Sequence, residues 1–234
     1  RLTTSGNTML TILNQILQPN ELAALRQTLR GLEYVDGRAS AGDHAGQVKR
    51  NEELKLDDAK VIEPLARAFM TAYGRNDTFR SAALPLHVAL PVFARYTEGM
   101  HYGSHIDEAV MGMSGKRFRT DIATTLFISS PSDYEGGELV VETSAGEQHF
   151  KLAAGDAVLY PASSLHRVET VTSGERLVAV SWIQSIVRDA GKRQILHDLN
   201  DVRESLMAHA PNEPRTHKSD RAYSNLLRMW AEVS

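Results

Sequence analysis

The segment 101–107 carries side chains that suit a metal ion. It reads His-Tyr-Gly-Ser-His-Ile-Asp, so that His105 and Asp107 are two residues apart. In an extended chain residues i and i+2 point to the same face, which predicts an imidazole and a carboxylate side by side. A third ligand from a distant strand would complete a triad of two histidines and one carboxylate, which leaves coordination positions open on iron(II).

His166 is the best candidate for this third ligand. It follows the stretch 155–161, which reads as a turn, a short buried strand and a strand-ending proline. Ten residues later Arg176 opens the very apolar stretch 177–187. A guanidinium at the start of a strand that faces a barrel interior needs a buried anion, and its planar fork suits a carboxylate in bidentate contact.

Other histidines have simpler interpretations. His101 has the same strand parity as His105, but Gly99 and Gly103 favour a loop at that point. His149 alternates within a predicted strand and is expected to face solvent. Four further histidines lack a carboxylate at ligand spacing, namely His87, His197, His209 and His217.

Two further motifs also favour structural roles. Arg119 and Asp121 precede a predicted strand, where an ion pair is the simpler interpretation and a substrate contact the alternative. Gly136 and Gly137 resemble part of a phosphate-binding loop, but no helix and no Lys-Ser or Lys-Thr pair follows them. We therefore expect a hairpin turn there.

The residues with this chemistry lie in a region rich in predicted strands. From about residue 84 to residue 189 short apolar stretches alternate with glycine-containing turns, and no alternation of strands with helices is evident. This pattern favours a sandwich, a jelly roll or a barrel. The predicted strands are 86–96, 122–129, 138–142, 148–152, 157–160, 165–171 and 177–187.

Helices are predicted on both sides of this region. Leucines at helical spacing predict a helix over 20–32, with Asn20 as its cap, and a second apolar stripe predicts a helix over 57–73. The stretch 36–47, rich in Gly, Ala and Asp, is expected to be a mobile loop. After Asp189 the stripe Ile195, Leu199, Val202 and Leu206 predicts another helix, and a polar stretch separates it from a last helix over 221–232.

These elements define the expected domain organisation. Residues 1–8 are expected to be a non-native leader, with Met9 as the natural start. Residues 9–83 would form N-terminal helices and a mobile loop packed on a barrel of residues 84–189, and residues 190–234 a C-terminal helical extension. This extension carries more apolar surface than the barrel needs, which predicts a homodimer through the C-terminal helices. The residues concerned are Leu226, Leu227, Met229 and Trp230.

The composition limits the possible functions. The 234 residues contain no cysteine, which excludes disulfides, thiolate metal sites and cysteine nucleophiles. The formal net charge is −3 and no long basic run occurs, so no nucleic-acid partner is expected. No apolar run approaches the roughly 20 residues of a membrane span, so no membrane association is expected. We expect a soluble, cytoplasmic protein.

Several longer motifs accompany the predicted ligands in a fixed order. They are Arg95-Tyr96, Tyr102-Gly103-x-His105-x-Asp107, Arg119-Thr120-Asp121, Tyr134-x-Gly136-Gly137-Glu138-Leu139, Leu159-Tyr160-Pro161, Ser163-Ser164-Leu165-His166 and Trp182-Ile183-Gln184-Ser185. Together with Arg176, they make the sequence resemble bacterial PKHD-type hydroxylases. These are 2-oxoglutarate oxygenases of the prolyl-4-hydroxylase catalytic-domain type. The resemblance runs from about Met9 to the C-terminus and is densest over 93–189.

The resemblance implies a fold and a set of site residues. The fold would be mainly β with flanking helices, a double-stranded β-helix of the jelly-roll or cupin-like kind. His105, Asp107 and His166 would hold Fe(II), and Arg176 would bind the distal carboxylate of 2-oxoglutarate. The Tyr96 phenol would hydrogen-bond the same carboxylate, although core packing is an equally good interpretation of a strand tyrosine. Dependence on L-ascorbate is also implied.

The implied reaction is a dioxygenase reaction that hydroxylates an unactivated C–H bond. It consumes O2 and 2-oxoglutarate and releases succinate and CO2, and the substrate would be an amino acid, a peptide or protein side chain, or a metabolite. One alternative is a non-catalytic sensor module that binds a metal or 2-oxoglutarate. A zinc hydrolase is a weaker alternative, because Arg176 would have no purpose in it.

One segment departs from the family pattern. Residues 48–53 read Val-Lys-Arg-Asn-Glu-Glu, whereas the pattern associated with the family is Val-Lys-Asn-Asn-x-Gln. Lys49, Asn51 and the loop 36–47 fall where such enzymes often keep a substrate lid. The departures at Arg50 and Glu53 mean that no substrate preference is carried over from the family.

Overall fold

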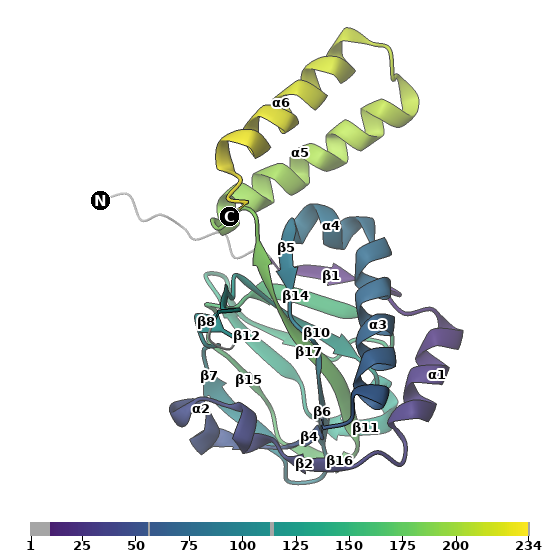
Figure 1. The fold of residues 1–234 in the computed structure, drawn as a ribbon, viewed down its shortest axis with the longest axis vertical. Coiled ribbons are helices and arrows are strands. Elements are labelled where there is room, and N and C mark those ends of the chain that lie inside the picture. The colour runs from purple at the N-terminus through teal and green to yellow at the C-terminus, as the bar shows by residue number, and fades with distance from the viewer. Residues whose placement is uncertain (1–9, 56, 113–114, 234) are drawn as a thin grey trace.

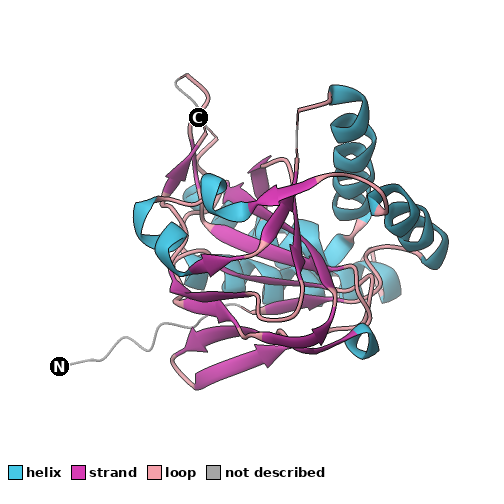
Figure 2. Cartoon of the chain, turned by 90° about the horizontal axis from the view of Figure 1, so that it is seen from below, coloured by secondary structure: helices cyan, strands magenta, loops and turns pink. Residues whose placement is uncertain are grey.

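The computed structural model describes residues 10–55, 57–112 and 115–233, so the predicted leader 1–8 and Met9 lie outside the described residues. Two sheets built of antiparallel strand pairs face each other, and helices cover the outer side of the larger one (Figure 1). Figure 2 shows the same layers from below. The predicted double-stranded β-helix with flanking helices is thereby confirmed.

The strands are short except for β17. They are β1 (Thr11–Leu13), β2 (Tyr34–Asp36), β3 (Lys49–Arg50), β4 (Glu52–Leu54), β5 (Pro85–Val88), β6 (Val92–Tyr96), β7 (His101–His105), β8 (Val110–Met111), β9 (Phe118–Arg119), β10 (Ile122–Phe127), β11 (Tyr134–Gly136), β12 (Leu139–Thr143), β13 (Gly146–Phe150), β14 (Ala157–Pro161), β15 (His166–Val168), β16 (Val171–Gly174) and β17 (Arg176–Ser185).

The helices precede and follow most of these strands. They are α1 (Pro19–Leu29), α2 (Asp43–Val48), α3 (Ala59–Arg75), α4 (Asp77–Ala83), α5 (Ala190–His209) and α6 (Pro214–Trp230), with the 3-10 turns η1 (Gly37–Ser40) and η2 (Pro131–Asp133). No described helix has the length and apolarity that crossing a membrane requires.

The larger sheet has the strand order β1-β14-β10-β17-β6-β4-β2, with β5 also paired to β17. The smaller sheet has the order β13-β12-β15-β7-β3. Every residue of β10 is buried, because Ile122 and Leu126 pack under the helices while Ala123 and Phe127 face the space between the sheets. That inner space is where alternate residues of both sheets converge.

The N-terminal region contributes strands as well as helices. The expected helices are confirmed as α1 and α3, but α1 begins after Gln18 rather than after Asn20. The Glu21 carboxylate accepts a hydrogen bond from the Gln18 amide at 2.8 Å, which satisfies a free N–H at the helix start. The stretch 36–47, expected as a loop, instead forms most of η1 and α2.

The C-terminal helices form an antiparallel hairpin that projects beyond the barrel (Figure 1). Its base is anchored by Leu196, which packs with Leu84 and Val187. Arg193, only 2% exposed, donates hydrogen bonds to the carbonyls of Val187 and Arg188 at 2.8 and 2.7 Å. The last helix begins at Pro214, so part of the stretch expected to be polar linker is helical.

Gly136 and Gly137 do not form the expected hairpin. Strand β11 pairs with β16, whereas β12 pairs with β13 and β15, so the two glycines carry the chain from one ladder to another. Both have positive φ, at 67° and 68°. The sequence shows that a turn is needed here, but the choice of partner strand depends on the packing of the whole sheet.

Candidate metal centre and active site

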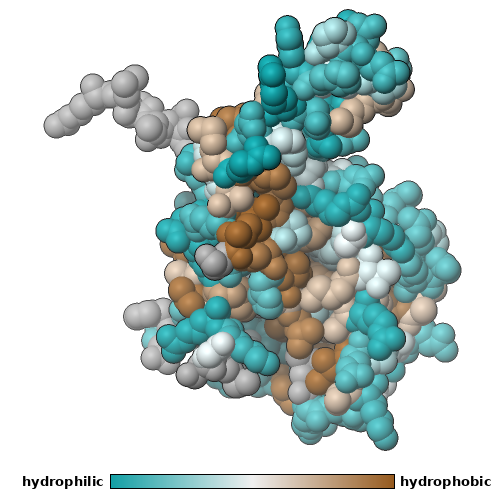
Figure 3. All heavy atoms as spheres, turned by 45° about the horizontal axis from the view of Figure 1, so that its top comes forward, coloured by the Kyte–Doolittle hydropathy of each residue, from teal (hydrophilic) through white to brown (hydrophobic). Residues whose placement is uncertain are grey.

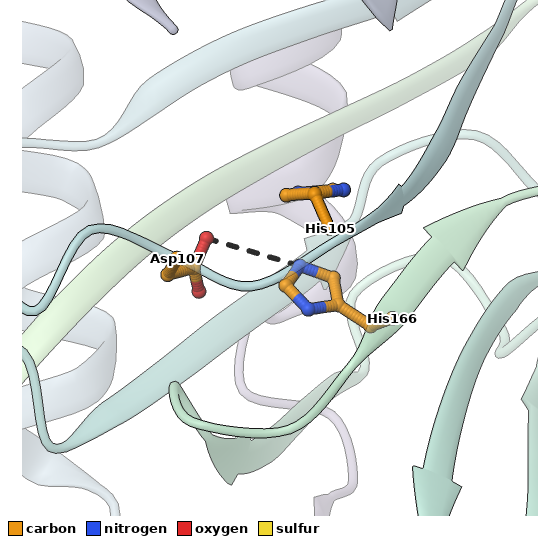
Figure 4. A group of neighbouring side chains, drawn as sticks. All are labelled: His105, Asp107 and His166. Carbon is orange, nitrogen blue, oxygen red and sulfur yellow. Dashed lines mark ion pairs between the residues drawn. The ribbon is translucent and has the colours of Figure 1, made fainter. Parts of the chain in front are cut away.

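Strand pairing brings the three predicted ligands together. In the ladder between β15 and β7, His166 lies directly opposite His105, and their ring centroids are 4.2 Å apart. Asp107 follows the end of β7 and places its carboxylate 3.8 Å from Nε2 of His166. The ligand atoms of the three residues all lie within 4.8 Å of one another (Figure 4).

The backbone fixes the orientation of both imidazoles. Nδ1 of His105 lies 2.8 Å from the Gly103 carbonyl, and Nδ1 of His166 lies 3.0 Å from the Ser164 carbonyl. A carbonyl only accepts hydrogen bonds, so each Nδ1 carries the proton and donates. Each Nε2 then has a free lone pair, which is the form in which histidine binds a metal.

Burial sets the charges of these groups. It lowers the pKa of His105 to about 3, so this imidazole is neutral over the ordinary pH range. Burial also raises the pKa of the Asp107 carboxyl, whose Oδ2 has no hydrogen-bond partner. A buried carboxylate without a counter-charge is costly, and the two imidazoles that face it complete a donor set that fits a divalent cation such as iron(II).

Arg176 provides an unpaired positive charge in the same interior. Its side chain is 1% exposed, and its Nε and Nη1 atoms have no hydrogen-bond partner. Its Cζ atom lies 5.0 Å from the ring centre of Tyr96 and 5.7 Å from that of Phe127. No described carboxylate lies within ion-pair distance of it, and a buried guanidinium in this state requires an anionic ligand.

Two tyrosines flank the guanidinium. Tyr96 is opposite Arg176 in the β6–β17 ladder and 3% exposed, and burial raises its pKa to about 12, so its phenol is a neutral donor. Burial likewise raises the pKa of Tyr134, whose hydroxyl has no partner although it lies close to Arg176. A Cβ atom on Gly137 would lie 3.1 Å from both Arg176 and Tyr134, so glycine makes this approach possible.

A single pocket connects the metal centre with Arg176. Its walls come from both sheets. In β17 of the larger sheet, the alternate residues Arg176, Val180 and Trp182 face inward. The turn and helix of residues 37–48 lie at one side and contribute Ser40, among others. The possible metal ligands and the unpaired guanidinium thus line one and the same pocket.

The other histidines considered in the sequence lie outside this cluster in the described part of the chain. His101 lies at the start of β7, in a strand rather than the expected loop, but four residues along a strand are about 13 Å. Its Nδ1 lies 3.4 Å from the Gly99 carbonyl. His149 is exposed on β13, as predicted. Arg119 donates to Asp121 at 2.6 Å, and Asp121 accepts from the Ser185 amide at 2.8 Å, which supports the structural interpretation of this pair.

Sequence reasoning missed two contacts within the pocket. Trp182 lies close to the Asp107 carboxylate and partly opposes the rise that burial causes in its pKa, yet the indole N–H has no hydrogen-bond partner of good geometry among the described residues. Lys49 and Glu53 form a buried ion pair in the same pocket. Trp182 and Arg176 are an even number of residues apart in one predicted strand, so the sequence could have placed both side chains on the same face. Nothing in the sequence indicated that Lys49 pairs with Glu53.

Comparison with known proteins identifies similar chains. A profile described as the 2OG-Fe(II) oxygenase superfamily matches residues 91–184. A PKHD-type hydroxylase of Thioalkalivibrio sulfidiphilus is 48% identical over 96% of this chain and 100% of its own length. A PKHD-type hydroxylase of Paracoccus denitrificans is 43% identical, also over 96% of this chain and 100% of its own.

The fold has counterparts among solved structures. A prolyl-4-hydroxylase of Pseudomonas putida superposes with a TM-score of 0.53 at 19% sequence identity. The match covers 79% of this chain and 95% of that protein. At this level of identity the likeness concerns the fold alone.

Proposed function

Because the chain belongs to the PKHD-type hydroxylases of the 2OG-Fe(II) oxygenase superfamily, we propose that it hydroxylates a C–H bond of a small-molecule or peptide substrate and releases succinate and CO2. By its family the chain is an iron(II)- and 2-oxoglutarate-dependent dioxygenase. Its relatives' names argue against the non-catalytic sensor module.

One observation supports the proposal most strongly. A buried guanidinium without an anionic partner shares a pocket with two imidazoles and a carboxylate. A dicarboxylate co-substrate fits between two such sites, since one end can pair with Arg176 while the other reaches the metal. A zinc hydrolase would leave Arg176 without a function.

The residues then have distinct roles. His105, Asp107 and His166 would hold iron(II), which when bound supplies the activation of O2. The carbonyls of Gly103 and Ser164 accept from Nδ1 of His105 and His166, which would leave Nε2 of each imidazole to bind the ion. Arg176 would bind the distal carboxylate of 2-oxoglutarate through its unpaired N–H groups, and the neutral Tyr96 phenol would donate to the same carboxylate.

A turnover assay tests this proposal. The full chain with added Fe(II) is expected to convert 2-oxoglutarate and O2 to succinate and CO2, slowly without substrate and faster when a substrate is present. Succinate and oxygen consumption are measured together. Tight 2-oxoglutarate binding without any succinate, across a broad range of amino acids and peptides, would contradict the proposal and favour the sensor module.

Ascorbate is proposed as a reductant for the enzyme on the basis of the family resemblance. It is expected to extend the number of turnovers before activity is lost, by returning oxidised iron to iron(II). Identical progress curves with and without ascorbate would reject this role.

We also propose that the C-terminal helices mediate a homodimer. Ile195 and Val202, seven residues apart on α5, are 51% and 54% exposed, and Met229 on α6 is 74% exposed. Leu226, Leu227 and Trp230 instead pack within the chain, against the cluster of Leu84, Val187 and Leu196. On the face drawn in Figure 3 the hairpin is mostly hydrophilic, so the contact would lie elsewhere on it. A monomeric mass in light scattering at micromolar concentration would reject the dimer.

A further inference from the structure

The segment 49–53 lines the pocket with three polar side chains. Lys49, Asn51 and Glu53 are 5%, 5% and 9% exposed, whereas Arg50 and Glu52 between them point outward. The segment connects the two sheets, because β3 pairs with β7 of the metal centre and β4 pairs with β6 of Tyr96. A cation, an amide and an anion therefore face the pocket from one extended stretch.

The two charges of this stretch are paired with each other. The Lys49 ammonium donates directly to the Glu53 carboxylate, and the two side chains are 7% and 11% exposed. Lys49 also donates to Ser40 Oγ at 2.8 Å. Its Nζ lies 5.2 Å from the ring centre of Tyr102, which in turn stacks on His105 at 3.6 Å. The Tyr102 ring thus contacts both the ion pair and His105 of the metal centre.

Asn51 adds buried hydrogen-bonding groups to the pocket. Its side-chain amide lies close to the Tyr96 hydroxyl, but neither Oδ1 nor Nδ2 has a hydrogen-bond partner of good geometry among the described residues. Gly37 leaves room for this amide, because a Cβ atom at position 37 would lie 2.1 Å from Oδ1. Buried polar groups of this kind are normally satisfied, so a donor and an acceptor are available to a ligand.

We propose that Lys49, Asn51 and Glu53 form the substrate subsite and select zwitterionic molecules, namely free α-amino acids. This inference rests on the proposed hydroxylase function. The substrate carboxylate would pair with Lys49 and its ammonium group with Glu53, so that one ion pair is replaced by two. The Asn51 side-chain amide would form a hydrogen bond with either the carboxylate or the ammonium group.

The selectivity follows from the cost of an unpaired buried charge. A molecule whose amine is masked would pair with Lys49 and leave the Glu53 carboxylate buried without a cation. A molecule whose carboxylate is masked would pair with Glu53 and leave the Lys49 ammonium buried without an anion. Leaving one member of a buried pair alone corresponds to a loss of roughly 100-fold or more in affinity.

A substrate panel with the iron-loaded full chain tests the inference. The panel contains the free L-amino acids, their N-acetyl derivatives and their α-carboxamides, and the readout is succinate formed above the substrate-free rate. At least one free amino acid is expected to stimulate turnover. Its N-acetyl and carboxamide forms are expected to have kcat/KM values lower by about 100-fold.

Variants reassign the selectivity in a defined direction. Glu53→Gln removes the anion, so the N-acetyl form is expected to gain at least about 10-fold relative to the free amino acid. Lys49→Met is expected to favour the carboxamide by a similar factor. The matched controls Arg50→Met and Glu52→Gln remove the same charges from the outward face and should leave both ratios unchanged. Each ratio is taken within one variant, so partial unfolding cancels.

Three results would overturn the inference. They are masked derivatives as active as the free amino acids, unchanged ratios in Glu53→Gln and Lys49→Met, and a panel in which no free amino acid stimulates turnover. The conversion of 2-oxoglutarate to succinate without substrate distinguishes a failure of the amino-acid subsite from a failure of the hydroxylase function. If the wild type lacks that conversion as well, the hydroxylase function fails; if it retains it, only the amino-acid subsite fails.

Discussion

Tyr96 and Arg176 lie directly opposite each other in the β6–β17 ladder, with the guanidinium carbon 5.0 Å from the tyrosine ring centre. Both side chains are almost fully buried, and neither meets an acidic group of the described chain at ion-pair distance. This arrangement underlies our proposal that Arg176 binds the anionic co-substrate, because a planar guanidinium suits a carboxylate in bidentate contact.

The first prediction concerns this guanidinium. Arg176→Met is expected to raise the KM for 2-oxoglutarate by about 100-fold or more, because a bidentate charge-assisted contact is lost. Tyr96→Phe removes one neutral donor and is expected to raise the same KM by at most about 10-fold. Arg95→Met is the matched control, since Arg95 points the other way and pairs with Glu52. An unchanged KM in Arg176→Met would remove Arg176 from the co-substrate site.

The second prediction concerns the metal centre. Asp107→Ala removes the only carboxylate of the triad, so iron content and succinate formation are both expected to fall to background. In the wild type, removal of iron with a chelator should abolish turnover and added Fe(II) should restore it. His101→Ala serves as the control, because His101 is on the same strand but outside the cluster. Full iron binding by Asp107→Ala, measured by metal analysis, would contradict the assignment.

The third prediction concerns Gly137. An alanine there would have to adopt a φ of 68°, and its Cβ would lie 2.9 Å from Val171 and 3.1 Å from Arg176. We expect a loss of about 1–3 kcal/mol in the free energy of unfolding, together with a raised KM for 2-oxoglutarate as Arg176 is displaced.

Gly146→Ala is the control that separates the effect of backbone strain from the effect of contact with Arg176. Gly146 also has a positive φ, at 105°, but nothing lies within 4 Å of a Cβ at that position. It should lose stability without a change in KM. Equal KM effects in the two variants would show that Gly137 does not position Arg176.

The fourth prediction is a pH dependence of stability. The Arg75 guanidinium bonds to Glu21 and lowers the pKa of this carboxyl from 4.5 to about 2. Because the pKa is lower in the folded state, the pair stabilises the fold above about pH 4.5, and this contribution is lost as the pH falls toward 2. Urea unfolding should show that Glu21→Gln is less stable than the wild type at pH 7 and that the difference shrinks below pH 4.5.

Glu63→Gln on the exposed side of α3 is the control for this titration. It should show no such convergence with the wild type at low pH. A constant difference between the wild type and Glu21→Gln over the whole range would mean that the ion pair does not contribute to the acid sensitivity of the fold.

The sequence by itself determined which three residues we propose as metal ligands and which arginine we propose as the co-substrate's partner. His105 and Asp107 are neighbours in the chain, so strand parity alone predicted a shared direction. His166 and Arg176 were recognised by type, spacing and the apolar strands that follow them. The fold class was also predictable, because alternation and turn residues are local properties of the chain.

Only the tertiary structure decided which distant side chains meet. Three features depend on strand partners that are far apart in the sequence. They are the register that sets His166 opposite His105, the pairing of β11 with β16 instead of a hairpin at Gly136 and Gly137, and the proximity of Tyr134 to Arg176. Lys49 and Glu53 became a pocket ion pair only because β3 and β4 join different sheets. Such pairings are selected by the burial of the whole core, which no local segment encodes.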